Sequence, residues 1–358
     1  MPVIDHDELR RIGRRVFAAG GSSEEEAGII IDHLVEANLK GHDSHGVGMI
    51  PTYVKNVKAG LLHPNRHARL VSETGALAVF DGGMGYGQVI AREATEWGIA
   101  KAKETGLAAF AVRNTHHVAR VGTYGELAAR AGLVSIHFVN VLIAPGRVAP
   151  FGGVGGRFGT DPVCITFPGT ATLPPVVLDF ATSRIAAGKI RVALNQGKKL
   201  EPGTLIDHDG RDSTDPAVFF ARDDKGGSML PFGEHKGSGL ALICELLGGA
   251  LSGGKTLSGR LDGGRKVLNG MLSILIDPAK MGTGENLARE TESFVAWHVA
   301  SPPAEGVGHV KIAGEPEREW KRQRLAEGIP VDPTTWREIV ASGAKVGLDK
   351  GAIEKLAS

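Results

Sequence analysis

The segment ALAVFDGGMGYGQVIAREATEWGIAKAKETGLAAFAV, residues 76–112, says more about the architecture of this protein than any other part of its sequence. Its two ends, residues 76–82 and 106–112, are short, apolar and partly β-branched, as buried strands are. The longer segment between them, from Gln88 to Lys103, has the character of a helix. A helix that joins two such strands predicts an α/β sheet covered by helices.

The same alternation continues toward the C-terminus. Further strands are predicted at residues 132–141 (GLVSIHFVNV), 162–168 (PVCITFP), 176–182 (VVLDFAT) and 271–277 (MLSILID). Helices are expected over residues 125–131 and 237–251, the second of which is apolar. We therefore expect an α/β body over residues 76–301.

The N-terminal region, residues 1–75, reads as helical. Ser22 or Ser23, followed by Glu25 or Glu26, forms a capping-box pattern before apolar residues at helical spacing. A short helix is expected around residues 49–57. After residue 301 the chain turns polar and irregular, and it closes with a helix around residues 336–346. The simplest layout has the 302–358 tail folding back to pack with the N-terminal region.

Composition and charge limit the class of protein. The 358 residues have a formal net charge of +1 and are 42% hydrophobic, which fits a packed globular chain without the strong basic field of a nucleic-acid binder. No apolar run approaches the roughly 18 residues of a membrane span, and the N-terminus has no apolar signal core. The two cysteines, Cys164 and Cys244, lie far apart in apolar runs and fit buried thiols. We expect a soluble cytoplasmic protein.

One motif points to a nucleotide hydrolase, but its context does not. GALSGGKT, residues 249–256, satisfies the phosphate-loop pattern G-x-x-x-x-G-K-[ST]. A phosphate loop joins a strand to a helix, whose N-terminus receives the anion. Here a helical segment precedes the motif, and the residues that follow contain too much glycine and charge for a helix. We therefore interpret the motif as a helix end with a glycine-rich turn and an exposed Lys255. The dinucleotide fingerprint G-x-G-x-x-G is also missing, and residues 83–87 come nearest to it.

Polar clusters mark where chemistry is expected. His42–Gly46 forms one, and Asn114–His117 forms another at the end of a predicted strand. Imidazoles titrate near neutral pH, so either cluster can move protons, whereas the alternative is solvated loop histidines or caps. A metal site of His42, Asp43, His45 and His117 is a further alternative. A third cluster is Asp179–Ser183 with Gly188 and Lys189, which has a shape suited to ribose or phosphate but is also explained by a capped helix. A fourth cluster is Glu234–Gly237.

Taken in order, the polar motifs identify a family. SHG (44–46), N-x-x-H (114–117), FGTDP (158–162), LDFATS (178–183), EHKG (234–237), GGALSGG (248–254) and GEPE (314–317) together resemble the malate/L-lactate dehydrogenase family of the non-Rossmann type. The resemblance covers nearly the whole chain. It implies an α/β fold with a family-specific non-Rossmann NAD(P)-binding sheet domain and a helical domain from the N- and C-terminal regions. It also implies hydride transfer between NAD(P)H and 2-oxo or 2-hydroxy carboxylic acids, in a homodimer.

The resemblance also assigns site residues. His45 matches the family's catalytic histidine, Ser44 would contact the substrate with Asp43 nearby, and His117 matches a second active-site histidine. A ketone reduction needs a proton as well as a hydride, and a charged histidine would also steady the developing alkoxide. No metal is implied. The cofactor contacts implied by the resemblance are His45, Arg120, Val121, Gly122, Leu178, Asp179, Phe180, Ala181, His235, Lys236, Asn269, Ile312, Ala313, Gly314 and Glu315.

Two departures from the family pattern bear on the substrate. Many family members have an arginine that binds the substrate carboxylate at the position of Met49. One branch of the family also has methionine there. The replacement clamp would be Arg120, Arg157, Arg184 or, as a weaker choice, His116, and the Met would favour bulky substrates such as aryl pyruvates over malate. Asp161 stands where Asn is more frequent, and a negative charge there argues against a dianionic substrate.

Several readings of function remain open at this stage. The choice between NAD and NADP is not fixed, and 2-oxoglutarate is another substrate to consider. Within the family, reduction of cyclic imino acids is the alternative reaction. Outside it, the alternatives are a phosphate-loop hydrolase, in which Lys255→Ala would abolish ATP binding, and a binding protein without catalysis.

Overall fold

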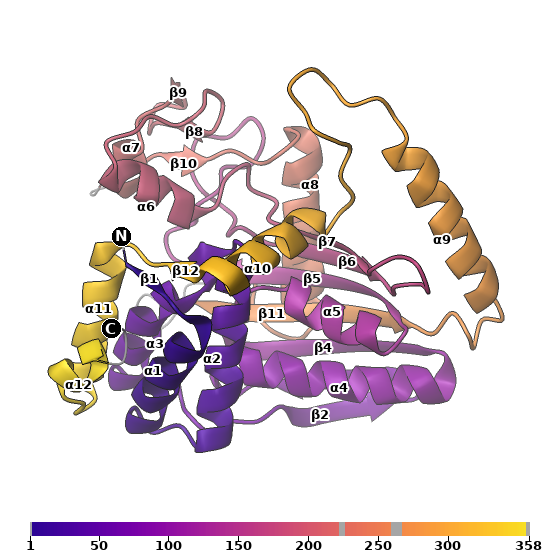
Figure 1. Cartoon of the computed structure of the whole chain (residues 1–358), viewed down its shortest axis with the longest axis horizontal. Helices are drawn as coiled ribbons and strands as arrows, with labels where there is room; N and C mark the ends of the chain where they lie inside the picture. The colour runs from indigo at the N-terminus through magenta and orange to yellow at the C-terminus, as the bar shows by residue number, and fades with distance from the viewer. Residues whose placement is uncertain (1, 222–225, 259–266, 356–358) are drawn as a thin grey trace.

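The computed structural model of this chain describes residues 2–221, 226–258 and 267–355. At its centre lies a seven-stranded sheet with the strand order β2-β3-β4-β11-β5-β6-β7 (Figure 1). β3 and β4 are parallel, and the other neighbouring pairs in this sheet are antiparallel. The strands are β2 (Arg69–Thr74), β3 (Leu77–Asp81), β4 (Leu107–His116), β5 (Val134–Leu142), β6 (Val163–Phe167), β7 (Val176–Phe180) and β11 (Leu268–Ile276).

The parallel pair is the unit predicted from residues 76–112, and the structure confirms it. β3 leads into α4 (Gly87–Thr105), which returns the chain to β4. The helix ends at Gly106, whose φ of +91° is open to glycine and strained for other residues. Within α4, Gly98 lets the helix approach the sheet, because a Cβ there would lie 2.4 Å from the Phe110 ring. Phe110, Met271 and Leu275 belong to the core between α4 and the sheet.

The other strands predicted from the sequence are also present, and the sheet extends further than predicted. β2 pairs with β3 at the edge of the sheet, so the sheet begins at Arg69, before residue 76. All six β2 residues are exposed, which is why the segment lacks an apolar strand pattern. α5 (Gly122–Arg130) packs on β5, β6 and β7, and α8 (His235–Cys244) continues into the π-helix η3 (Glu245–Ala250), which packs on β5 and β11.

The GALSGGKT segment has the structure that its context predicted. It begins inside η3 and runs into a turn, so a helix precedes it where a phosphate loop needs a strand. Part of the segment after it, residues 259–266, lies outside the described residues.

The two ends of the chain share one core. Buried residues of α1 (His6–Ala19), α2 (Glu24–Leu39) and α3 (Ile50–Lys58) pack with those of α11 (Pro333–Lys345) and α12 (Lys350–Lys355). β1 (Val3–Ile4) pairs with β12 (Ile329–Pro330), so the first and last parts of the chain lie side by side (Figure 1). The Ser23 hydroxyl accepts from the Glu26 amide and caps α2, as the capping pattern predicted.

Two helices differ from the sequence-based expectations. The segment expected to be irregular after residue 301 contains α10 (Glu315–Glu327), which packs against α2. α9 (Gly284–Val299) lies in a segment for which no helix was predicted; none of its 16 residues is buried, and its Glu292 accepts from Thr170 and Thr172 in the loop between β6 and β7.

A small third cluster forms above the sheet, from α6 (Ala187–Asn195), α7 (Ala217–Phe220), β8 (Leu205–Ile206), β9 (Asp212–Ser213) and β10 (Ser228–Met229). Among the helices in the described ranges, none combines the length and apolar character that crossing a membrane requires. Cys164 and Cys244 are buried and not joined in a disulfide, as predicted.

Candidate active site

The loop of residues 40–46 follows α2 and carries the SHG motif in a short 3-10 helix, η1 (Asp43–His45). Asn38, on the last turn of α2, holds this loop with both ends of its side chain. Its Oδ1 accepts from the Val47 amide at 2.7 Å, and its Nδ2 donates to Asp43 Oδ1 at 2.6 Å. Gly46 is required here, because a Cβ would lie 2.1 Å from Asn38 Oδ1.

Asp43 does not orient His45, contrary to the expectation that placed it among the catalytic residues. Its carboxylate accepts from both terminal nitrogens of Arg324, at 2.6 and 3.0 Å, in a bidentate pair. Arg324 lies on α10 and also donates to the backbone oxygen of Asn38. The pair forms because α10 packs across the end of α2, so Asp43 fixes the 40–46 loop to α10 and does not contact the imidazole.

His45 and His117 come together from different elements. His117 follows β4, and its ring stacks on that of His45 with centroids 5.4 Å apart and an interplanar angle of 20°. Ser44 Oγ lies 3.0 Å from His45 Nδ1. Gly188, in the first turn of α6, faces Ser44, since a Cβ on Gly188 would lie 2.7 Å from Ser44 Cβ. The structure therefore brings Ser44, His45 and His117 together in one compact group.

A buried hydrogen-bond chain fixes the tautomer of His117. Gln88 Nε2 donates to the Tyr53 hydroxyl at 2.8 Å, and that hydroxyl lies 2.8 Å from His117 Nδ1. Because the Tyr53 oxygen already accepts from an amide, its own proton is directed to Nδ1. His117 then carries its proton on Nε2. Tyr53 and Gln88 were missed from sequence, although Tyr53 stands nine residues after Ser44 within the SHG-containing motif.

Burial keeps the site histidines neutral. It lowers the pKa of His45 to about 4, with the charges of His42 and Arg120 acting in the same direction. It also holds the pKa of His117 well below its usual range, with His45 and His116 adding to the effect. At neutral pH the His45 imidazole is therefore suited to accept a proton, whereas His117, with its proton on Nε2, is suited to donate a hydrogen bond.

The turn that follows β4, residues 118–122, brings several predicted cofactor residues together. Asn269 Oδ1 accepts from the Val118 amide at 2.9 Å, and Asp179 Oδ2 accepts from the Gly122 amide at 2.8 Å. The predicted 312–315 segment reaches the same strand as Asp179, because the Val177 amide donates to the Ala313 oxygen at 3.2 Å. Gly314 begins α10 with a φ of +86°, and Glu315 accepts from the Ile312 amide.

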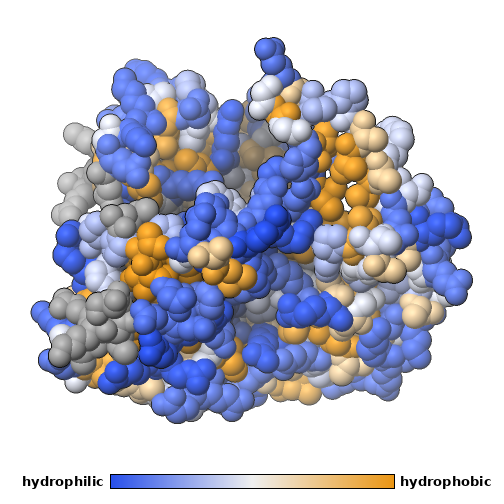
Figure 2. All heavy atoms as spheres, in the orientation of Figure 1, coloured by the Kyte–Doolittle hydropathy of each residue, from blue (hydrophilic) through white to orange (hydrophobic). Residues whose placement is uncertain are grey.

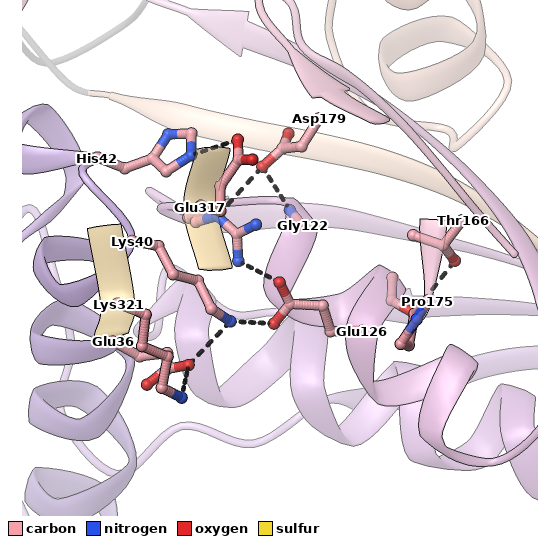
Figure 3. A network of polar contacts seen from close by, with 12 residues as sticks. Glu36, Lys40, His42, Gly122, Glu126, Thr166, Pro175, Asp179, Glu317 and Lys321 are labelled. Carbon is pink, nitrogen blue, oxygen red and sulfur yellow. Dashed lines mark hydrogen bonds and ion pairs between the residues drawn. The ribbon is translucent and has the colours of Figure 1, made fainter. Parts of the chain in front are cut away.

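Figure 3 shows Glu126 and Asp179 beside Lys40 and His42 of the 40–46 loop, and Arg120 forms ion pairs with both of these acidic residues. Its side chain is 1% exposed, and it pairs with Glu126 at 2.9 Å and with Asp179 at 3.5 Å. Glu126 pairs in turn with Lys40. Arg120 Nε makes no hydrogen bond and lies in the ion pair with Asp179, whereas Nη2 is buried without a hydrogen-bond partner. A buried cationic donor such as Nη2, beside the N-terminus of α5, fits an anionic group such as a dinucleotide phosphate.

The remaining predicted cofactor residues lie around β7 and the start of α8. Asp179 points toward α5, whereas the alternation of the strand turns Leu178 to the other side, where it is 44% exposed. The Phe180 ring lies 5.4 Å from that of Phe232, and the Phe232 amide donates to the Thr182 oxygen just after Ala181. His235 and Lys236 lie a few residues after Phe232 and are exposed at the start of α8.

The two family departures have structural explanations. Met49 packs against the core shared by the two chain ends. Asp161 is fully buried, and burial together with Glu245 raises its pKa well above the usual range. Burial therefore disfavours the negative charge on which the argument against dianionic substrates depends.

The proposed carboxylate clamps are engaged elsewhere. Arg120 pairs with acidic residues, Arg157 donates to Gly156, and Arg184 donates to Gly203. His116 is buried beside Asn56, and burial lowers its pKa to about 4.

The metal alternative is not supported by the geometry of its four residues. His42 Nε2 lies 3.3 Å from Glu317 on α10, and Asp43 binds Arg324. His45 and His117 stack face to face. The four side chains therefore point to separate partners and do not converge on one point.

Comparison with known proteins agrees with this site. Residues 4–340 match the malate/L-lactate dehydrogenase family. Hydroxycarboxylate dehydrogenase B of Escherichia coli (strain K12) is 44% identical over 353 residues, covering 98% of this chain and 96% of that protein. A Δ1-pyrroline-2-carboxylate/Δ1-piperideine-2-carboxylate reductase of Pseudomonas syringae pv. tomato is 32% identical over 334 residues, 92% of each chain. The solved structure of sulfolactate dehydrogenase from Methanocaldococcus jannaschii has a TM-score of 0.86 and 33% identity, covering 98% of this chain and 99% of that one.

The fold, the site and these relatives together define an oxidoreductase. The chain belongs to the malate/L-lactate dehydrogenase family, and the family and the α/β fold class predicted from its sequence are confirmed.

Proposed function

We propose that the protein transfers hydride between NAD(P)H and 2-oxo or 2-hydroxy carboxylic acids. The observation that carries this proposal is the stacked pair of neutral histidines, His45 and His117, together with a turn that holds the buried Nη2 donor of Arg120. The names of the relatives, which include a hydroxycarboxylate dehydrogenase and a sulfolactate dehydrogenase, support the same substrate class.

His45 and His117 handle the proton of the reaction. In the oxidation direction a neutral imidazole accepts the proton of the substrate hydroxyl, and in the reduction direction the protonated ring returns it. Ser44, hydrogen-bonded to His45, orients that ring and contacts the substrate. Tyr53 and Gln88 hold His117 in the tautomer with the proton on Nε2, which is then available as a donor to the substrate oxygen.

The nicotinamide cofactor, when bound, supplies or takes up the hydride. We assign its binding to the residues that the family pattern implied, among which the 120–122 turn, Asp179 and the 312–315 segment adjoin one another. The Nη2 donor of Arg120 binds phosphate charge, and either NAD or NADP fits that role.

The substrate is a small 2-oxo or 2-hydroxy acid. Since burial raises the pKa of Asp161 and so disfavours its negative charge, both monoanionic aryl pyruvates and the dianion 2-oxoglutarate are retained in the proposal. The alternative is reduction of cyclic imino acids, favoured by the 32% identity to a reductase of that kind.

We propose a homodimer, supported by apolar side chains that the single chain leaves uncovered. On α9, Phe294 is 63% and Trp297 72% exposed, and on α8, Leu242 is 50% exposed. Apolar atoms gather beside α9 at the upper right of Figure 2. Exposed apolar area of this kind is typical of interfaces between copies. Trp297→Glu is expected to produce a monomer by light scattering. We also propose a cytoplasmic location, which the two unpaired buried thiols support.

A substrate screen tests the central proposal. Purified protein is mixed with NADH or NADPH and with pyruvate, oxaloacetate, phenylpyruvate, 2-oxoglutarate or a cyclic imino acid, and the absorbance of the reduced nicotinamide is followed. We expect consumption with a 2-oxo acid that His45→Asn and His117→Asn both reduce by about 10²–10⁴-fold, the usual contribution of general acid–base catalysis. Turnover of the imino acid alone would select the alternative. Equal rates for His45→Asn and the parent would refute the assigned proton transfer.

A further inference from the structure

The turn of residues 118–122 has a backbone conformation that needs support. Ala119 has a φ of +58°, a region that a residue with a side chain enters at a cost of roughly 1–2 kcal/mol. Such a conformation persists only where neighbouring groups hold it. Asn269 and Asp179 hold the two ends of the turn, through the amides of Val118 and Gly122, and both come from the central sheet.

A third acceptor comes from outside the sheet. His33, on α2, accepts from the Arg120 amide through Nε2 at 3.1 Å. The side chain is buried, with 6% exposure, and its ring lies 5.6 Å from that of Tyr124. A ring nitrogen that accepts carries no proton, so His33 is neutral with its proton on Nδ1. Burial, together with nearby Arg120, lowers the pKa of His33 to about 3, which maintains that state at neutral pH.

The position of His33 also links the two halves of the site. α2 ends at Leu39 and leads directly into the 40–46 loop with His45. The hydrogen bond from Arg120 therefore fixes the 118–122 turn relative to the helix that positions the catalytic histidine.

We propose that His33 is a positioning residue for nucleotide binding, which acts by holding the Arg120–Gly122 turn in the conformation that receives the dinucleotide. The inference rests on the proposed function, because the role of the turn in cofactor binding comes from there. His33 itself touches neither substrate nor cofactor. Its loss is thus expected to change nucleotide affinity more than the rate of the bound complex.

Two variants of matched length separate the hydrogen bond from packing. Gln places an oxygen three bonds from Cβ, where His has Nε2, and Met has the same reach without a strong acceptor. We expect His33→Met to raise the Kd and KM for NAD(P)H by about 5–15-fold, the effect of one hydrogen bond, with kcat within about twofold. His33→Gln is expected to remain within about twofold of the parent. Equal nucleotide affinities for the Met and Gln variants would overturn the proposal.

Hydrogen exchange of the Arg120 amide tests the contact directly, first in the parent protein and then in one variant. We expect the Arg120 amide to be protected in the parent protein and to exchange faster in His33→Met. An unprotected Arg120 amide in the parent would overturn the proposal even if His33→Met failed to fold. Should the parent bind neither NADH nor NADPH, the proposed function fails, and a protected amide would then leave His33 a structural residue only.

Discussion

Replacing Tyr53 with Phe tests the hydrogen-bond chain that sets the His117 tautomer. The change keeps the ring, which contacts Tyr86 with centroids 5.9 Å apart, and removes only the hydroxyl. Gln88 Nε2 and His117 Nδ1, each 2.8 Å from that hydroxyl, both lose their partner. Tyr53 is fully buried, and Gln88 is 1% exposed, so water does not readily replace the lost bonds.

The magnitude follows from these two bonds. A buried polar group left without a partner costs about 1–3 kcal/mol, so the free energy of unfolding is expected to fall by roughly 2–4 kcal/mol. For catalysis, His117 is no longer held with its proton on Nε2, and only part of the population has the active tautomer. A loss of about 1.4–2.8 kcal/mol of transition-state stabilisation corresponds to a roughly 10–100-fold decrease in kcat/KM.

Steady-state kinetics and urea unfolding are the assays, with Tyr86→Phe as the matched control. Tyr86 is 2% exposed in the same aromatic cluster, so its variant also removes a buried hydroxyl. We expect Tyr86→Phe to lower stability with little change in kcat/KM, and Tyr53→Phe to lower both. The reasoning about the tautomer fails if the two variants have the same kcat/KM.

Three further perturbations test other parts of the site. The pKa of His45 is lowered to about 4, so the protonated ring that reduction needs becomes more abundant as pH falls from 8 to 5. We expect kcat/KM for reduction to rise by up to about tenfold per pH unit over that range, while kcat/KM for oxidation does not change. A kcat/KM for reduction that is independent of pH would contradict this. Because the pKa of the buried Asp161 carboxyl is raised in the folded protein, its contribution to stability declines as pH rises above 3.8. Asp161→Asn removes this group and should therefore raise the free energy of unfolding by about 1–3 kcal/mol at neutral pH. Urea unfolding at pH 5 and pH 8 checks the sign, and a difference that does not grow with pH would count against it. Arg324→Met should destabilise the fold by roughly 1–2 kcal/mol, a modest value because the Asp43 side chain is 52% exposed. It should also lower kcat without changing the Kd of the nucleotide, which titration measures. An unaltered kcat would show that the 40–46 loop does not need α10.

The parts of the site that the sequence predicted are local motifs. Ser44 and His45 are adjacent, and His117 follows a strand recognisable by its apolar residues. The strand order could not be predicted from the sequence, because β11 lies between β4 and β5 although more than 120 residues separate it from either strand. The stacking of His45 on His117 depends on that order and could not be read from spacing.

The contacts that the sequence analysis missed are long-range and polar. α10 was expected to be irregular because its 13 residues have only one buried member, Arg324, and no apolar stripe. It binds α2 and the 40–46 loop through ion pairs, from Glu317 to His42, Lys321 to Glu36 and Arg324 to Asp43. Charged residues on a helix usually face water, so nothing in the local pattern indicates such partners.

The pairing of Asp43 with Arg324 has a consequence for synthesis in the cell. The two residues are separated by 281 positions, and a ribosome adding about 5–20 residues per second needs roughly 14–56 s to make the chain between them. During that interval α2 and the SHG motif are already outside the ribosome, while the guanidinium that clamps them has not yet been translated. The loop is thus clamped to α10 only late in synthesis, and a chain that stops before Arg324 keeps the contacts of Asn38 with the loop but lacks the bidentate partner of Asp43.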